Sequence, residues 1–331
     1  METRRHWCSK SAYCSPPSSQ PRVMLWTTPQ STSTILTKCL SAAVPNPQRI
    51  VKTRSARGVY DGAVVKDGPA DDIDDEPSDE LLQQAAETMC SEDCSGGRVC
   101  TDMLRFRHIK RLLENPNSSK RFVFCKDFGH SIVDRYEFLP DRTAQYRHAF
   151  LIRHPAKMFR SRRKVLLAEY ESSRGGAKKT YQAAKSREEF HLLKDAPSWY
   201  NPPGLCYKEL YELTAYVREN VDPHLVILDS DDLLSNPAVV LPKFCDALGI
   251  PYSERLLSWS PDPVATDEWQ NAFSPIRSFE FINMFCHTAF ESSQFFSPGP
   301  VPGDNDLTDD VKECVEYCLP FYKEMHQMRL C

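Results

Sequence analysis

The chain of 331 residues lacks several features that would place it in a common class of protein. It contains no Gly-x4-Gly-Lys-Ser/Thr motif, which argues against an ordinary ATPase or GTPase. No apolar run approaches the roughly 18 residues that a membrane span needs. No apolar core follows Arg4 and Arg5, so we expect no secretory signal. The net charge of -4 does not by itself favour binding to nucleic acid or to an anionic membrane.

The cysteines predict free thiols rather than a disulfide framework. There are 13 of them, scattered along the chain, and no Cys-x2-Cys pair occurs, so we expect no metal site. Cys314 and Cys318 are four residues apart on a predicted helix, where they would share a face instead of forming a bridge. We therefore expect a cytoplasmic protein in a reducing compartment. The sequence leaves the oligomeric state undetermined.

Composition divides the chain into a lead-in and one domain. Residues 1–20 are rich in Ser, Pro and Cys and show no hydrophobic periodicity, so we predict that they are disordered. Residues 21–331 form a single predicted α/β domain. Within it, residues 44–100 form an irregular insert, which carries scattered Pro and Gly and the acidic run Asp71–Glu76. The pattern allows only one short helix there, over Leu81–Met89.

Short apolar runs elsewhere alternate with amphipathic helices, which predicts a parallel sheet with helices on both faces, in three layers. The predicted strands are Val23–Trp26, Arg121–Lys126, His148–Arg153 and Leu225–Leu228. The main predicted helices follow Pro29, Thr101, Pro155, Tyr207, Asn236 and Thr308. We interpret residues 171–203 as an exposed excursion that could act as a lid.

The first strand leads directly into a candidate anion site. It is followed by a tight turn at Pro29 and by four hydroxyl residues, Ser31, Thr32, Ser33 and Thr34, where the next helix would begin. The first turn of a helix presents unpaired backbone N–H groups and the positive end of the helix dipole. Such a strand, turn and helix suit a phosphate.

A second candidate site follows another predicted strand. Arg153 closes an apolar run, and Ser161 lies two helical turns into the next element. An arginine fork and a hydroxyl can hold one phosphate from two sides. The alternative is a strand-end charge that reaches solvent. In parallel sheets, ligands bind beyond the carboxyl ends of the strands, where both candidate sites are expected.

The segments Pro29-Gln-Ser-Thr-Ser-Thr34 and Arg153-His-Pro-Ala-Lys-Met-Phe-Arg-Ser161 resemble the two phosphate-binding signatures of the sulfotransferases. The segments Leu228–Pro237 and Ala247–Pro251 are similar to that family too. The resemblance covers about residues 22–43 and 101–330, in a divergent branch. It implies a P-loop NTPase-like fold, 3′-phosphoadenosine 5′-phosphosulfate (PAPS) as sulfuryl donor, no metal and a small-molecule acceptor.

The resemblance also implies roles for individual residues. Pro29, Gln30 and the residues from Ser31 to Thr34 would cradle the 5′-phosphosulfate, and Arg153 with Ser161 would hold the 3′-phosphate. Family members place Lys or Arg where this chain has Gln30. Losing a charged stabiliser can cost on the order of 10²–10³ in rate, so a binding or regulatory relative with impaired catalysis is the alternative.

Lys126 and His130 are candidates for the remaining chemistry. Lys126 ends a predicted strand at a position where the family often has lysine, and a solvated lysine is the alternative. His130 has the intrinsic pKa of a general base near neutral pH. The family's usual base position is Phe128 here, so the resemblance does not assign the base. Asp127 caps a helix in one interpretation and lines the site in the other.

Three further clusters have two interpretations each. Asp229, Asp231 and Asp232 would suit Mg²⁺ or cap the next helix. The basic run Arg160–Lys164 would attract an anionic donor or acceptor or form a charged outer face. Trp259 and the segment Phe290–Phe296 would line the acceptor side or pack in the core.

Overall, we predict a sulfotransferase that acts on a hydroxyl or amine of a small acceptor. The missing phosphate-loop lysine argues against a small-molecule kinase.

Overall fold

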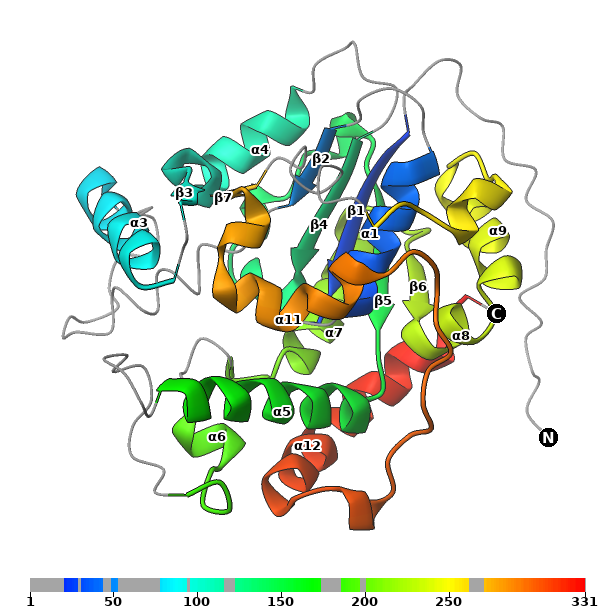
Figure 1. The fold of residues 1–331 in the computed structure, drawn as a ribbon. Helices are drawn as coiled ribbons and strands as arrows, with labels where there is room; N and C mark the ends of the chain where they lie inside the picture. Colours follow the sequence, from blue (N-terminus) through cyan, green and yellow to red (C-terminus); the bar gives the residue numbers. More distant parts are fainter. Residues whose placement is uncertain are drawn as a thin grey trace, which may run out of the picture.

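The computed structural model describes residues 21–28, 31–43, 49–52, 78–93, 96–115, 123–173, 186–196, 201–261 and 271–330. Its centre is a sheet with the spatial strand order β2-β4-β1-β5-β6, in which every pair is parallel (Figure 1). The strands are β1 (Arg22–Thr27), β2 (Arg49–Lys52), β4 (Val123–Phe128), β5 (Arg147–Ile152) and β6 (Val226–Asp229). The predicted P-loop-like parallel sheet is confirmed, and its central strand is β1.

The central strands form where apolar runs occur in the sequence. In β1, Val23, Met24, Leu25 and Trp26 are all at most 4% exposed. Strand β5 is buried in the same way from His148 to Ile152. Strands in parallel sheets are covered on both faces, so nearly every side chain along them must be buried. This requirement explains why β1 and β5 were recognisable without any alternation of polar and apolar residues.

The edge strand β2 corrects the sequence prediction. It lies inside residues 44–100, where no strand was expected, and it pairs with β4 from Arg49↔Val123 to Lys52↔Lys126. A strand of four residues with a charge at each end has no apolar run that would mark it. The lead-in 1–20, the acidic run Asp71–Glu76 and most of the insert lie outside the described residues.

Helices cover both faces of the sheet, and the crossover rule explains their placement. α1 (Ser31–Ala43) connects β1 to β2 in one direction along the sheet, whereas α4 (Phe106–Glu114) and α7 (Tyr207–Asn220) lie in connections that run the other way. Because parallel crossovers are right-handed, α1 must lie on one face and α4 and α7 on the other.

Later elements complete the two helical layers. α9 (Pro237–Leu248) lies on the α1 side, where Cys39 donates to the carbonyl of Leu256 at 3.0 Å in the following 3-10 helix. α12 (Asp309–Gln327) packs against α7, for example through Tyr211 and Phe321, whose ring centroids are 5.8 Å apart. α11 (Glu280–Glu291) lies over α1 (Figure 1).

The remaining elements are short or peripheral. A small antiparallel pair joins β3 (Arg98–Val99) to β7 (Phe273–Ser274). The other helices are α3 (Asp79–Asp93), α6 (Leu192–Asp195) and α8 (Ser230–Ser235). The short helix predicted over Leu81–Met89 therefore exists and extends further at both ends.

Residues 171–203, predicted to be an exposed excursion with some helix, are partly exposed and partly helical in their described part, but some of their apolar residues are buried. α5 (Pro155–Ser173) continues past residue 171, and Phe190 and Leu192 are 2% and 0% exposed in the core. Residues 174–185 and 197–200 lie outside the described part, so the lid stays a prediction there. The buried apolar residues of this segment are separated by polar residues at spacings that match neither a helix nor a strand. The sequence prediction therefore missed them.

Candidate functional site

The carboxyl ends of the parallel strands meet at one edge of the sheet, and the predicted site segments lie along it. β1 ends at Thr27 and is paired there with Phe128 of β4 and with Leu151 of β5. The turn before α1, the Lys126–His130 loop and Arg153 therefore follow three neighbouring strands. α5 runs below this edge, from the end of β5 toward the side of β4 (Figure 1).

The turn between β1 and α1 is described only in part. Thr27 and Thr28 are fully buried, while Pro29 and Gln30 lie outside the described residues. α1 begins at Ser31, as predicted, so the backbone N–H groups of its first turn belong to Ser31, Thr32 and Ser33.

Thr34 has a different environment from the one expected of a phosphate ligand. Its side chain is fully buried, and its Oγ1 lies 3.6 Å from the Sγ of Cys286 on α11. The hydroxyl therefore faces the contact between α1 and α11. The partly exposed Cys286 is in turn a near neighbour of the first turn of α1.

Lys38 holds α11 against α1, a role that the sequence analysis missed. Its Nζ donates to the carbonyl oxygens of Ala289, Phe290 and Ser292, at 3.2, 2.8 and 3.0 Å. Cations stabilise the C-terminal ends of helices, where these carbonyls have no helical partner. Burial and the nearby Arg277 lower the pKa of Lys38 to about 8. A single lysine among apolar residues of a helix was the only signal in the sequence.

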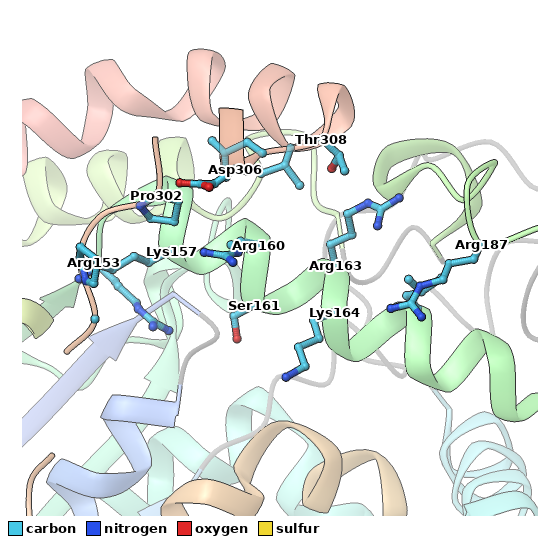
Figure 2. A pocket seen from close by; sticks show the side chains of 15 residues that line it. Arg153, Lys157, Arg160, Ser161, Arg163, Lys164, Arg187, Pro302, Asp306 and Thr308 are labelled. Carbon is cyan, nitrogen blue, oxygen red and sulfur yellow. The ribbon is translucent and has the colours of Figure 1, made fainter. Parts of the chain in front are cut away.

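The structure brings Arg153 and Ser161 together in one cavity of about 560 Å³. The cavity lies between α5 and the segment 299–308 that precedes α12 (Figure 2). Six cationic side chains line it, and Asp306 is the only carboxylate in its described lining. The six are Arg153, Lys157, Arg160, Arg163, Lys164 and Arg187. Such a surplus of positive charge is typical of an anion site.

Arg153 is fixed at the mouth of this cavity by the fold. Its backbone carbonyl accepts a hydrogen bond from the hydroxyl of the buried Tyr207 at 2.7 Å. The Nε of Arg153 is buried and has no hydrogen-bond partner among the described residues. Burial lowers the pKa of Arg153, opposed by Tyr207, Asp231 and Asp229, yet arginine stays charged at neutral pH. A buried donor without a partner is costly, and a phosphate oxygen would satisfy it.

Three of the other cations are paired with carboxylates, among them Arg187, which lies 3.8 Å from Glu171. Lys157 lies 2.7 Å from Asp231, and Arg163 lies 3.0 Å from Asp310 while donating to the carbonyl of Phe190. These pairs fix α5 to α8 and to the start of α12. Arg160 and Lys164 have no salt bridge within the described part of the chain, and both are exposed to the cavity.

Lys126 and His130 lie at the end of β4, on either side of Phe128. The Nζ of Lys126 is 5.1 Å from the centroid of the Phe128 ring, and the His130 ring stacks on Phe128 at 5.5 Å. Both candidates are mostly buried, at 8% and 9% exposed. Neither belongs to the described lining of the cavity around Arg153, so their catalytic roles stay predictions.

Asp127 and the three aspartates after β6 have structural partners. Asp127 accepts hydrogen bonds from the backbone N–H of Phe128 and the hydroxyl of Ser131. Asp229 accepts from the N–H groups of Asp231 and Asp232 and caps α8, as the capping interpretation predicts. Among the described residues, no group of three or more metal-ligating side chains lies close enough to hold an ion.

Two of the predicted acceptor-side aromatics, Trp259 and Phe290, pack in the core, whereas Phe296 is exposed. Trp259 is 7% exposed, its ring stands edge-on to Phe295, and its Nε1 donates to the carbonyl of Ser292 at 2.7 Å. Phe290 is almost completely buried. The core interpretation is therefore the correct one for Trp259 and Phe290.

The described helices and cysteines bear on the predictions about membranes and thiols. None of the described helices is long and apolar enough to cross a membrane. The eight described cysteines are free thiols, Cys314 and Cys318 among them, as predicted.

The structure combines a parallel α/β sheet with a cavity lined by cationic side chains. Residues 215–329 match the family model described as a sulfotransferase domain, which confirms the resemblance that the sequence motifs predict. The part of the chain from residue 215 to 329 is therefore similar to a sulfotransferase domain. The match spans α7 to α12, and both predicted phosphate-binding signatures lie outside it.

Individual relatives are distant. One is branched-chain-amino-acid aminotransferase-like protein 2 of Arabidopsis thaliana, 23% identical over 251 residues, which are 76% of this chain and 33% of the relative. The chain thus spans about a third of the length of that curated relative. Among solved structures, the sulfotransferase domain of the Synechococcus olefin synthase is 14% identical, covering 92% of this chain and 98% of that one with a TM-score of 0.36. A sulfotransferase of Alicyclobacillus acidocaldarius is 12% identical, covering 71% and 82% with a TM-score of 0.36.

Proposed function

We propose that the protein transfers a sulfuryl group from PAPS to a hydroxyl or amine of a small acceptor. The observation that supports this most strongly is the cationic cavity that contains both Arg153 and Ser161. The two residues were singled out in the sequence as one half of a clamp for a nucleotide with two phosphate groups. A cavity of about 560 Å³ falls in the size range of small-ligand sites.

The 3′-phosphate of the donor would bind at Arg153 and Ser161. The guanidinium offers a planar pair of donors, and its buried Nε has no other partner among the described residues. The hydroxyl of Ser161 lines the cavity from α5 and is exposed to it. Lys157 also lines the cavity, but its charge is paired with Asp231.

The 5′-phosphosulfate would bind at the start of α1. Backbone N–H groups of Ser31, Thr32 and Ser33 belong to the first turn, where the helix dipole favours an anion. Pro29 and Gln30 would complete the turn around it. Because the Thr34 hydroxyl faces Cys286, we expect Thr34 to support the cradle from behind rather than to bind the ligand.

Catalysis would depend on residues at the end of β4. When bound, the donor supplies an activated sulfuryl group. By analogy with phosphoryl transfer, the protein would then act chiefly by positioning groups and stabilising charge. Lys126 supplies a positive charge near the carboxyl edge, and His130 is the candidate base for the acceptor proton. Gln30 could donate a hydrogen bond but adds no charge.

One assay tests this proposal against the alternative of an impaired binding protein. Purified wild-type protein and a Gln30→Arg variant are incubated with ³⁵S-labelled PAPS and a panel of phenols, alcohols and amines. We expect label in an acceptor from wild-type protein and faster transfer by Gln30→Arg. If neither transfers label while both bind adenosine 3′,5′-bisphosphate, the enzyme proposal is wrong and the binding module is correct.

Binding of the nucleotide is measured in parallel with Arg153→Ala, and with Arg255→Ala as the control. Arg255 is exposed in a 3-10 helix and does not line the cavity. We expect a loss of about 100-fold in affinity for Arg153→Ala, since a charge-assisted hydrogen-bonded pair is broken. Equal affinity in the two variants would show that the phosphate site is elsewhere.

A further inference from the structure

The cavity carries more positive charge than one phosphate group requires. Lys157, Arg160, Ser161 and Lys164 follow the spacing i, i+3, i+4 and i+7, so they share one face of α5. Lys157 is neutralised by Asp231. Arg153 and Ser161 are assigned to the donor in the proposed function. The proposed function then assigns no anion to Arg160 and Lys164.

Arg160 and Lys164 also cost the helix some stability. They are four residues apart, and like charges at this spacing repel each other on a helix. Neither forms a salt bridge with a described residue, although Arg163 between them does. Two cations face the cavity without a salt bridge to a described residue. A site for a second anionic group would contain such cations.

Lys164 lies one helical turn beyond Ser161 on α5. Lys164 and Ser161 point from the same side of α5 toward α1 and α11, and Lys164 lies further along the helix from Arg153 (Figure 2). In that direction α5 passes toward the side of β4, the strand that contains Lys126 and precedes His130 (Figure 1). Gly299, Pro300 and Pro302 line the same open cavity as these exposed cations.

We propose that Lys164, assisted by Arg160, binds an anionic group of the acceptor, a carboxylate or a phosphate or sulfate ester. This inference rests on the proposed function, because it assigns the acceptor's chemical class at the same site. A lysine ammonium is a compact point charge that suits all three anions. The acceptor would then be held by its charge at the Lys164 end of the cavity, with its reacting hydroxyl or amine directed toward the sulfuryl group.

The test uses the full chain saturated with adenosine 3′,5′-bisphosphate at low ionic strength. Binding of two matched pairs is measured by saturation-transfer NMR: 4-hydroxybenzoate with 4-hydroxybenzamide, and 3-hydroxybutyrate with 3-hydroxybutyramide. The proteins are wild type, Lys164→Gln, Lys164→Arg and the control Lys194→Gln. Lys194 is an exposed lysine on α6 that does not line the cavity.

We expect at least one anion to bind at least tenfold more tightly than its amide. Lys164→Gln should remove that preference, whereas Lys164→Arg and Lys194→Gln should keep it, and nucleotide affinity should differ from that of wild type by less than threefold in all three variants. The inference is overturned if the amides bind as well as the anions, if no anion binds, or if Lys164→Gln binds them like wild type. A loss of nucleotide affinity in Lys164→Gln would place Lys164 in the donor site instead. If wild-type protein does not bind the nucleotide, the proposed function fails and the inference fails with it.

Discussion

Asp310 joins two elements that line the cavity, α5 and the start of α12, to α6, so its replacement by asparagine should weaken this wall of the cavity. Its Oδ2 accepts from the Nε of Arg163 at 3.0 Å and from the backbone N–H of Leu192 at 2.8 Å. The hydroxyl of Thr308 and the N–H of Val311 donate to Oδ1. Through these bonds α5, α6 and the start of α12 meet at one carboxylate that is only 6% exposed.

The expected loss of stability depends on the burial of the ion pair and on the hydrogen bond that Arg163 retains. Breaking a buried ion pair by removing one partner costs about 3–5 kcal/mol. Arg163 is 16% exposed and would retain its hydrogen bond to the carbonyl of Phe190 at 2.8 Å. Asparagine also preserves the shape of the side chain and one acceptor oxygen. We therefore expect Asp310→Asn to lower the free energy of unfolding by about 2–3 kcal/mol.

Urea unfolding at pH 7 measures this change, and the neighbouring Asp309→Asn is the matched control. Asp309 pairs with Lys312 on the surface, and its side chain is fully exposed. Exposed pairs contribute less than about 1 kcal/mol. If Asp310→Asn and Asp309→Asn lower the stability equally, the carboxylate does not hold the wall together and the reasoning fails.

The same carboxylate should give the stability difference a defined pH dependence. Burial would raise the pKa of Asp310, but hydrogen bonds from Thr308, Leu192 and Arg163 outweigh it and lower the pKa below 3.8. A lowered carboxyl pKa stabilises the folded state above the unfolded value, and this stabilisation is lost as pH falls through the folded value. The gap between wild type and Asp310→Asn should be constant above about pH 5 and shrink below 3.8.

Three further predictions concern buried or half-buried groups. Lys38→Met removes the ammonium that binds three carbonyls at the end of α11. Urea unfolding should show that the free energy of unfolding falls by about 2–3 kcal/mol. A fall as small as that of the control Lys194→Met would contradict this role of Lys38. His148 accepts a hydrogen bond from Trp26 at 3.0 Å and is fully buried, and burial lowers its pKa from 6.5. Because the unfolded chain then binds a proton that the folded chain does not, stability should fall below pH 6.5 by up to about 1.4 kcal/mol per unit, and His148→Gln should lack this slope. Alkylation of Cys286, followed by peptide mass spectrometry, should slow when adenosine 3′,5′-bisphosphate is bound, and an unchanged rate would separate Cys286 from the donor cradle.

Sequence reasoning located the strands that must be buried on both faces. In a chain of this composition, apolar runs such as those of β1 and β5 indicate buried strands. Arg153 was recognisable because it follows one of these runs. The helix after Pro29 was predictable because four hydroxyl residues follow a buried strand. Patterns of this kind are local, so they can be seen without knowing what packs against them.

What sequence reasoning missed depends on contacts between distant segments. Strand β2 exists because β4 offers a free edge, not because Arg49–Lys52 has a strong preference of its own. Lys38 is fixed by carbonyls that lie more than 250 residues away along the chain. The burial of Thr34 depends on α11 in the same way. No spacing within one segment contains this information.

The central claim, a clamp for a nucleotide with two phosphate groups, is tested most directly by isothermal titration calorimetry with two nucleotides. Adenosine 3′,5′-bisphosphate and adenosine 5′-monophosphate differ only in the 3′-phosphate that Arg153 and Ser161 would bind. We predict that wild-type protein binds the bisphosphate at least about 100-fold more tightly, and that Arg153→Ala removes most of this difference. Equal affinity for the two nucleotides in wild-type protein would contradict the account.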